Sequence, residues 1–134
     1  MDVTVSYVQG VQLSAQSRQH TLLSDQPLDN GGTDQGMTPP EWFLAALGAC
    51  VGFYAVKFLQ TRNLDPSTLT IRITADKASQ PTRLDPIQIQ LSLGIPLDPQ
   101  QEAGLKRAVD ACIIHNTLTH PPTLTTEILL PSVV

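Results

Sequence analysis

The feature that most constrains this sequence is a run of fifteen residues, 42–56, that contains no charged side chain. Thr38, Pro39 and Pro40 precede the run in an order typical of a helix start, and Lys57 follows it where a cation suits the helix dipole. As a helix the run spans about 22 Å. A membrane crossing needs about 20 apolar residues, so fifteen are too few for one. We therefore predict a helix that forms the buried spine of a domain or of a dimer.

Segments with β-forming residues occur in groups on either side of this helix, without regular strand–helix alternation. Residues 25–40 are rich in Asp, Asn, Gly and Pro and predict a long loop. A second helix is predicted to begin at Asp98, which is a typical N-cap residue. Pro99 follows at the first helical position, and Gln101 stands where a capping box needs it. The expected strands are residues 3–8, 11–15, 20–24, 69–75, 87–93 and 123–130. The sequence thus predicts an α+β fold, with antiparallel sheets around a long buried central helix, in a single domain covering residues 1–134.

The low charge of the chain points to an oligomer. Charged residues make up 15% and hydrophobic residues 41%, with a formal net charge of −4. The sequence contains no basic run, so we expect neither nucleic acid nor a membrane as a partner. No Lys or Arg precedes Arg18, which argues against a secretory signal and favours a cytoplasmic location.

The two cysteines raise the main chemical question. Cys50 lies in the middle of the uncharged helix, and Cys112 falls on the apolar face of the second helix with Leu105 and Val109. Both thiols could be inert apolar filling, or their sulfurs could meet if both helices pack on one sheet. The sequence alone leaves these two interpretations open.

A reactive thiol needs a nearby cation, because the thiolate is the working species. The uncharged helix offers none, so a cation would come from elsewhere in the chain or from a second chain. Arg18 and His20 are the best-placed candidates, and both could equally be exposed strand residues. Glu41 could be a site carboxylate or a simple N-terminal acid of the helix, and His115 could be a helix C-terminal cation.

The sequence resembles the OsmC/Ohr family, the osmotically inducible protein C and organic hydroperoxide resistance proteins. The resemblance rests on residues 31–50, GGTDQGMTPPEWFLAALGAC, and residues 110–118, DACIIHNTL. It implies a homodimer of two interlocked chains and a thiol peroxidase. Cys50 would be the peroxidatic thiol, and Cys112 the resolving thiol that forms a disulfide with it.

The resemblance also assigns roles to other residues. Arg18 matches the arginine that activates the peroxidatic thiol, with Glu41 as a possible orienting group. An apolar pocket would favour organic hydroperoxides, and an external dithiol, either a lipoyl protein or a small thiol, would reduce the disulfide. No metal or other cofactor is expected. The residues expected to line the pocket are His20, Trp42, Phe43, Phe53 and Tyr54.

The sequence departs from the family pattern around the glutamate, around the second cysteine, where Ile113 and Ile114 separate Cys112 from His115, and after Arg18, where Gln19 and His20 follow. The family glutamate precedes the first cysteine by ten residues, where this chain has Pro40, and Glu41 is nine residues before Cys50. A helix turns by about 100° per residue, so this carboxylate would point elsewhere. An alternative function is therefore a non-catalytic protein of the same type that binds a small ligand in the apolar dimer pocket.

Overall fold

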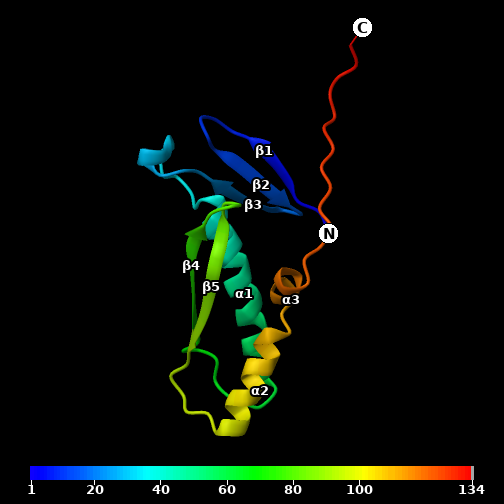
Figure 1. Cartoon of the computed structure of the whole chain (residues 1–134). Coiled ribbons are helices and arrows are strands. Elements are labelled where there is room, and N and C mark those ends of the chain that lie inside the picture. Colours follow the sequence, from blue (N-terminus) through cyan, green and yellow to red (C-terminus); the bar gives the residue numbers. More distant parts are fainter. Residues whose placement is uncertain (134) are drawn as a thin grey trace.

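The computed structural model describes residues 1–133 and contains two antiparallel sheets and three α-helices, an α+β architecture (Figure 1). Strands β1, β2 and β3 form one sheet in that order, and β4 and β5 form the other. The elements are β1 Thr4–Tyr7, β2 Leu13–Ser17, β3 His20–Ser24, the short 3₁₀ helix η1 Leu28–Asn30, α1 Pro39–Gln60, β4 Thr70–Ala78, β5 Arg83–Ser92, α2 Pro99–Asp110 and α3 Ile113–Thr119.

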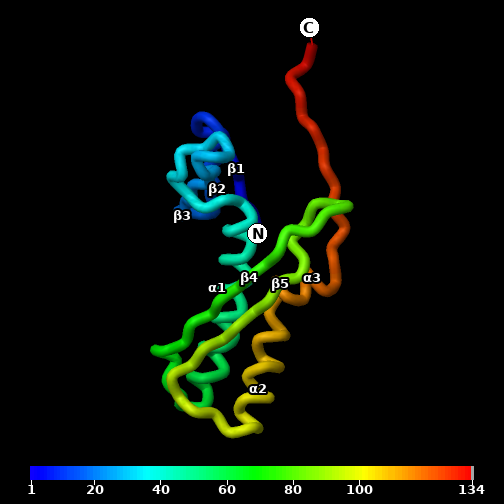
Figure 2. The backbone as a smooth tube through the Cα atoms, turned by 60° about the vertical axis from the view of Figure 1, so that its left-hand side comes forward, coloured from blue at the N-terminus to red at the C-terminus, as the bar shows by residue number. Residues whose placement is uncertain are grey.

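The β1–β2–β3 sheet has one apolar face, which is largely exposed among residues 1–133. The register places Val5, Ala15 and Leu22 side by side on this face, and Thr4, Gln16 and Thr21 side by side on the other. Val5 is 55% exposed and Leu22 is 60% exposed. The sheet lies beyond the N-terminal end of α1, apart from β4 and β5 (Figures 1 and 2).

The loop between β3 and α1 folds around a buried carboxylate. Asp25, 1% exposed, accepts hydrogen bonds from Gln12 Nε2, Thr33 Oγ1 and the backbone N–H groups of Gln26, Thr33 and Gln35. These donors, with Gln12 first, hold the pKa of the Asp25 carboxyl well below its usual range. The loop is therefore organised from within, by side-chain and backbone donors that converge on one anion.

Two glycines allow the loop to close. A Cβ atom on Gly32 would collide with the carbonyl oxygen of Gln26, and one on Gly36 would collide with that of Leu23. The neck of the loop is joined by a hydrogen bond from Asp25 N to Met37 O, 3.3 Å. The next residue, Thr38, is the N-cap of α1, so the loop fixes where the central helix begins.

Helix α1 starts where the sequence predicts, but it is buried on one side only. The buried residues form a stripe at helical spacing, whereas Phe43 is 39% exposed and Phe53 is 58% exposed on other faces. By length and composition α1 could cross a membrane, but this is weak evidence because the core helix of a soluble protein passes the same test. The buried residues are Leu47, Val51, Ala55, Phe58 and Leu59.

The core lies between α1, α2 and one face of the β4–β5 hairpin. Ile71 and Ile73 of β4 face α1 at Gly52 and Gly48, where an added Cβ would lie 3.1 and 3.2 Å from the isoleucine side chains. The two glycines thus allow close approach of a sheet rather than of a second helix. The Asp98 capping box begins α2 as expected. Figure 2 shows α1 and α2 side by side against the hairpin.

Three expectations about secondary structure need correction. Both strands of the second hairpin are longer than predicted, because the polar residues near its turn also pair, as Lys77 does with Leu84. Helix α3 was not expected. The strand predicted at residues 123–130 is wrong for the chain as described: these residues pair with no strand among residues 1–133, and Leu124 is 88% exposed. An extended segment needs a neighbouring edge to become a strand, and here it runs away from both sheets (Figures 1 and 2).

Candidate redox site

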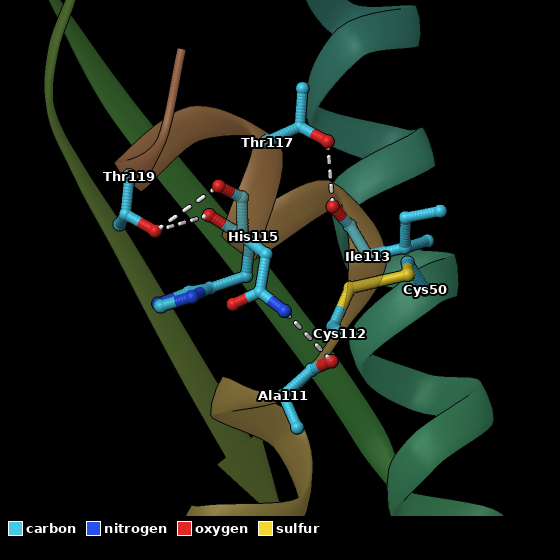
Figure 3. The surroundings of a disulfide bond; sticks show 8 residues. Cys50, Ala111, Cys112, Ile113, His115, Thr117 and Thr119 are labelled. Carbon is cyan, nitrogen blue, oxygen red and sulfur yellow. Dashed lines mark hydrogen bonds between the residues drawn. A yellow bond between two sulfur atoms is a disulfide. The ribbon is translucent and has the colours of Figure 1, made fainter. Parts of the chain in front are cut away.

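The two cysteines form a disulfide between the central helix and the junction of α2 and α3 (Figure 3). Their Cα atoms are 6.1 Å apart, within the usual range for a disulfide. The sequence predicts Cys112 on the second helix, but α2 ends at Asp110, and Cys112 is instead the N-cap residue of α3. It packs in the same core cluster as Val109 of α2 and Val51 of α1. The question that the sequence left open is therefore answered: the sulfurs meet.

The two halves of the disulfide differ in exposure. Cys112 is 0% exposed and belongs to the hydrophobic core. Cys50 is half-buried, next to the exposed residue Ala49, and Phe53 one turn further on is also exposed. Solvent therefore reaches the pair from the α1 side.

His115 follows Cys112 by three residues but does not contact the sulfurs through its ring. The ring points away from them (Figure 3), and its Nε2 lies 3.9 Å from Asp110 Oδ1. Its Nδ1 is buried without a hydrogen-bond partner. Asp110 also accepts a hydrogen bond from Lys106 Nζ at 2.8 Å.

Arg18 and His20 lie where β2 turns into β3. Arg18 occupies the turn between β2 and β3 with a φ of 53°, and it lines an open hollow with Met1, Asp2 and Gln16. Both side chains are exposed. Among residues 1–133 no hydrogen bond joins Arg18 to Cys50 or Cys112.

Glu41 is held at the start of α1. Thr38 Oγ1 donates a hydrogen bond to Glu41 Oε1 at 2.8 Å, and Glu41 N donates to Thr38 Oγ1 at 3.4 Å. A carboxylate in the first turn is stabilised by the helix dipole. In this chain Glu41 is therefore hydrogen-bonded at the helix terminus.

The aromatic residues of α1 surround Cys50 on one face of the helix. A spacing of seven residues aligns Phe43 with Cys50, and Phe53 and Tyr54 lie one turn beyond on either side. The rings of Phe53 and Tyr54 meet edge to face, with centroids 5.6 Å apart. Trp42 is half-buried. Exposed Phe43 and Phe53 leave this aromatic face open in the single chain.

Metal chemistry has no obvious centre here. In the part of the chain that the structure describes, no three His, Cys, Asp or Glu side chains lie together where they could hold a metal ion.

The sequence analysis did not predict the cluster of Gln12, Asp25 and Thr33, which supports the loop before α1. Its partners are eight and thirteen residues apart and leave no periodic signal in the sequence.

The comparisons with known proteins now decide the family. Residues 32–127 match the family of OsmC-like proteins. The chain belongs to the OsmC-like family. No curated protein matches it significantly.

Solved OsmC-like structures share the fold at low sequence identity. The chain is similar to a candidate osmotic stress induced and detoxification response protein from Psychrobacter arcticus, at 20% identity, a TM-score of 0.78, and coverage of 86% of this chain and 85% of that one. It is also similar to an OsmC-like protein from Mycoplasma pneumoniae, at 20% identity, a TM-score of 0.76, and coverage of 90% and 87%. An organic hydroperoxide resistance protein OsmC from Legionella pneumophila is 13% identical, with a TM-score of 0.66 and coverage of 87% of both chains.

Proposed function

We propose that this OsmC-like protein is a thiol-dependent peroxidase that reduces organic hydroperoxides. The observation that carries the proposal is the disulfide between half-buried Cys50 and fully buried Cys112. The Cys50 thiolate attacks one peroxide oxygen, the O–O bond breaks, and the alcohol leaves after taking up a proton. Cys50 is then a sulfenic acid, and condensation with the Cys112 thiol releases water and forms the disulfide. An external dithiol, a lipoyl protein or a small thiol, supplies the two electrons that restore both thiols.

The working form is a homodimer. The apolar face of the first sheet, the outer face of α1 and the extended segment after α3 all leave large apolar side chains in solvent, among them Leu22, Phe53 and Leu129 at 60, 58 and 82% exposed. Large exposed apolar surface marks a protein interface. A second copy would cover these surfaces and offer the segment 123–130 a strand to pair with.

The dimer also supplies the missing cation. Arg18 lies in the turn between β2 and β3, and no hydrogen bond joins it to Cys50 among residues 1–133, so we place the Arg18 of one copy near the Cys50 of the other. There it lowers the pKa of the thiol and orients the peroxide. His20 lies on the same strand segment, and the aromatic face of Trp42, Phe43, Phe53 and Tyr54 receives the organic group. We expect this single-domain protein to act in the cytoplasm.

The test is an intact-mass measurement on the reduced protein with one equivalent of cumene hydroperoxide, or of hydrogen peroxide in parallel. We expect the loss of two hydrogens per chain, faster with cumene hydroperoxide, and its reversal by dihydrolipoamide. Cys50→Ser should consume no peroxide, and Cys112→Ser should stop at the sulfenic acid. Equal peroxide consumption by the wild type and Cys50→Ser would refute the mechanism.

The alternative is a non-catalytic protein that binds a small ligand in the dimer pocket. It is favoured by the engagement of Glu41 with Thr38, which leaves this carboxylate at the helix terminus. The thiol pKa of Cys50 in Cys112→Ser separates the two functions. A value well below the ordinary 8.5 or so supports catalysis, and a raised value supports the ligand-binding protein.

A further inference from the structure

A cavity of about 460 Å³ lies between helix α2, the buried stripe of α1 and the β4–β5 hairpin. Its most deeply buried lining residues are Val51, Leu105 and Val109, which are 1, 8 and 7% exposed. Half-buried leucines from the end of β5 and the chain that follows it line another side, at positions 91, 93 and 97. Small-molecule sites are concave and mostly apolar, with volumes of about 300–1000 Å³. The cavity therefore has the size and the lining of such a site.

This cavity is separate from the surfaces that the proposed dimer covers. No residue of the first sheet or of the segment after α3 lines it, and α1 contributes Val51, which belongs to the buried stripe of that helix and not to its outer face. Neither Cys50 nor Cys112 lines it. Association of two chains through the proposed surfaces therefore takes no lining residue from the cavity.

Charged residues of α2 line one side of the cavity. Glu102, Lys106 and Asp110 follow one another at intervals of four residues, which places them along one face of the helix. Lys106 Nζ donates a hydrogen bond to Asp110 Oδ2 at 2.8 Å, so this cation is already matched by a carboxylate. The exposed Glu102 carboxylate has no ion-pair partner among residues 1–133. This side of the cavity therefore carries one unmatched negative charge.

We propose that the cavity binds a small amphiphile with an aliphatic tail and a primary ammonium head. The tail packs among the leucine side chains, where each buried methylene removes apolar surface from water. The ammonium head stays at the edge beside Glu102, because an ionised carboxylate accepts hydrogen bonds from N–H donors. An anionic head at the same place would be repelled by the Glu102 charge, which disfavours a fatty acid. The proposal goes beyond the peroxidase and does not depend on it, since neither cysteine takes part.

The experiment compares three ligands that share one tail and differ in the charge of the head: n-octylammonium, n-octanol and n-octanoate. Each is titrated at pH 7 into the full-length protein in its own oligomeric state, and ¹H–¹⁵N correlation spectra follow the amide signals. We expect n-octylammonium to shift the signals of Leu91, Leu97 and Leu105. It should bind about two- to fivefold more tightly than n-octanol, as an exposed ion pair allows, and n-octanoate should bind most weakly. Each methylene removed from the tail should weaken binding about fourfold.

Two pairs of variants test the tail and the head separately. Leu97→Trp fills the cavity and should abolish binding, whereas Gln90→Trp, on the opposite face of β5 from Ile89 and Leu91, should leave it unchanged. Glu102→Gln should bind n-octanol as before and lose the preference for n-octylammonium. Asp29→Asn makes the same change of net charge at an exposed position outside the cavity and should keep that preference.

Several results would overturn the proposal. One is the absence of shifts at the lining residues, which is also the result expected if the partner's chain fills the cavity in the dimer. Another is binding of n-octanoate as tight as that of n-octylammonium. A third is an equal loss of preference in Glu102→Gln and Asp29→Asn, which would mean that the cation is attracted by the net charge of the protein alone. None of these measurements involves peroxide, so the proposal and the peroxidase stand or fall separately.

Discussion

Gln12 and Asp25, thirteen residues apart, are joined inside the first half of the molecule by a hydrogen bond of 3.0 Å from Gln12 Nε2 to Asp25 Oδ2. Both residues are almost completely buried, at 5% and 1% exposed. The carboxylate has no cationic partner among residues 1–133, and hydrogen-bond donors alone satisfy it. This arrangement connects the β1–β2 turn to the loop that ends at the N-cap of α1, the helix that carries Cys50.

Asp25→Asn tests this connection. The amide of Asn cannot accept as many hydrogen bonds as a carboxylate, so the backbone N–H groups of Thr33 and Gln35 lose their acceptor, and buried donors without acceptors destabilise a fold. We expect a clearly lower urea midpoint of unfolding for Asp25→Asn. Asp29→Asn, an exposed position in the same loop, is the control and should leave the midpoint unchanged. Equal midpoints for the two variants would show that the cluster does not stabilise the protein.

The same carboxylate predicts a dependence of stability on pH. Hydrogen bonds, from Gln12 first, lower the pKa of Asp25 in the folded state below its unfolded value of about 3.9. A depressed folded pKa stabilises the fold above the unfolded pKa, and this stabilisation is lost as the pH falls from there toward the folded pKa. Below pH 4 the free energy of unfolding should therefore fall more steeply with decreasing pH for the wild type than for Asp25→Asn. The difference in slope corresponds to the uptake of at most about one proton on unfolding. Urea titrations between pH 2.5 and 7, at roughly one-unit steps, measure this difference, and parallel curves would contradict it.

The sequence predicts those elements whose signals are local. Thr38 and Pro39 mark the start of α1, and period-two alternation at residues 69–75 and 87–93 marks the second hairpin. The sequence could pose the disulfide only as a question, because the two cysteines are 62 residues apart. Whether they meet depends on how α1 packs against the α2–α3 junction.

Other features escape prediction because their causes are not local. Helix α3 contains β-branched residues of modest helix propensity, such as Ile113 and Thr117, and no side-chain cap begins it. Residues 123–130 are rich in β-branched residues, which favour a strand, but a strand forms only where an edge is available to pair with. The position of Arg18 relative to Cys50 is likewise a matter of tertiary or quaternary arrangement, which no spacing in the sequence encodes.

The core of the second half should respond strongly to truncation. Leu59 of α1 is 0% exposed in the core cluster with Phe58 and Leu105. Leu59→Ala removes buried apolar surface and leaves a cavity, which should lower the free energy of unfolding by about 3 kcal/mol. Leu28→Ala, at a position 76% exposed, is the matched control and should change it by less than about 0.5 kcal/mol. Chemical denaturation measures both, and similar losses would mean that the packing around Leu59 is not as described.

The loop glycines also predict an effect on stability. Because a Cβ on Gly32 would collide with the backbone oxygen of Gln26, Gly32→Ala must open the loop around Asp25. We expect a loss of about 2 kcal/mol or more, within the range of severe single substitutions. Gly48→Ala meets only the side chain of Ile73, at 3.2 Å, which can shift, and should cost less. Thermal unfolding of the two variants ranks them, and a milder effect for Gly32→Ala would contradict the loop geometry.

The last prediction concerns the proposed dimer. Leu22 and Thr21 are neighbours on β3 that point to opposite faces of the first sheet, Leu22 to the apolar face with Val5 and Ala15. Leu22 is already 60% exposed in one chain, so Leu22→Glu should not disturb the fold of that chain. It would place a charge in the proposed interface, however, and an unpaired charge buried between subunits is strongly unfavourable.

We therefore expect Leu22→Glu to weaken dimerisation at least about a hundredfold, which corresponds to roughly 3 kcal/mol. Thr21→Glu on the opposite face should leave it unchanged. Sedimentation equilibrium gives both dissociation constants, and far-ultraviolet circular dichroism confirms that the chains remain folded. If Arg18 of one copy serves Cys50 of the other, peroxidase activity should fall in step with the loss of dimer in Leu22→Glu. A folded monomeric Leu22→Glu with full activity would show instead that the site is complete within one chain.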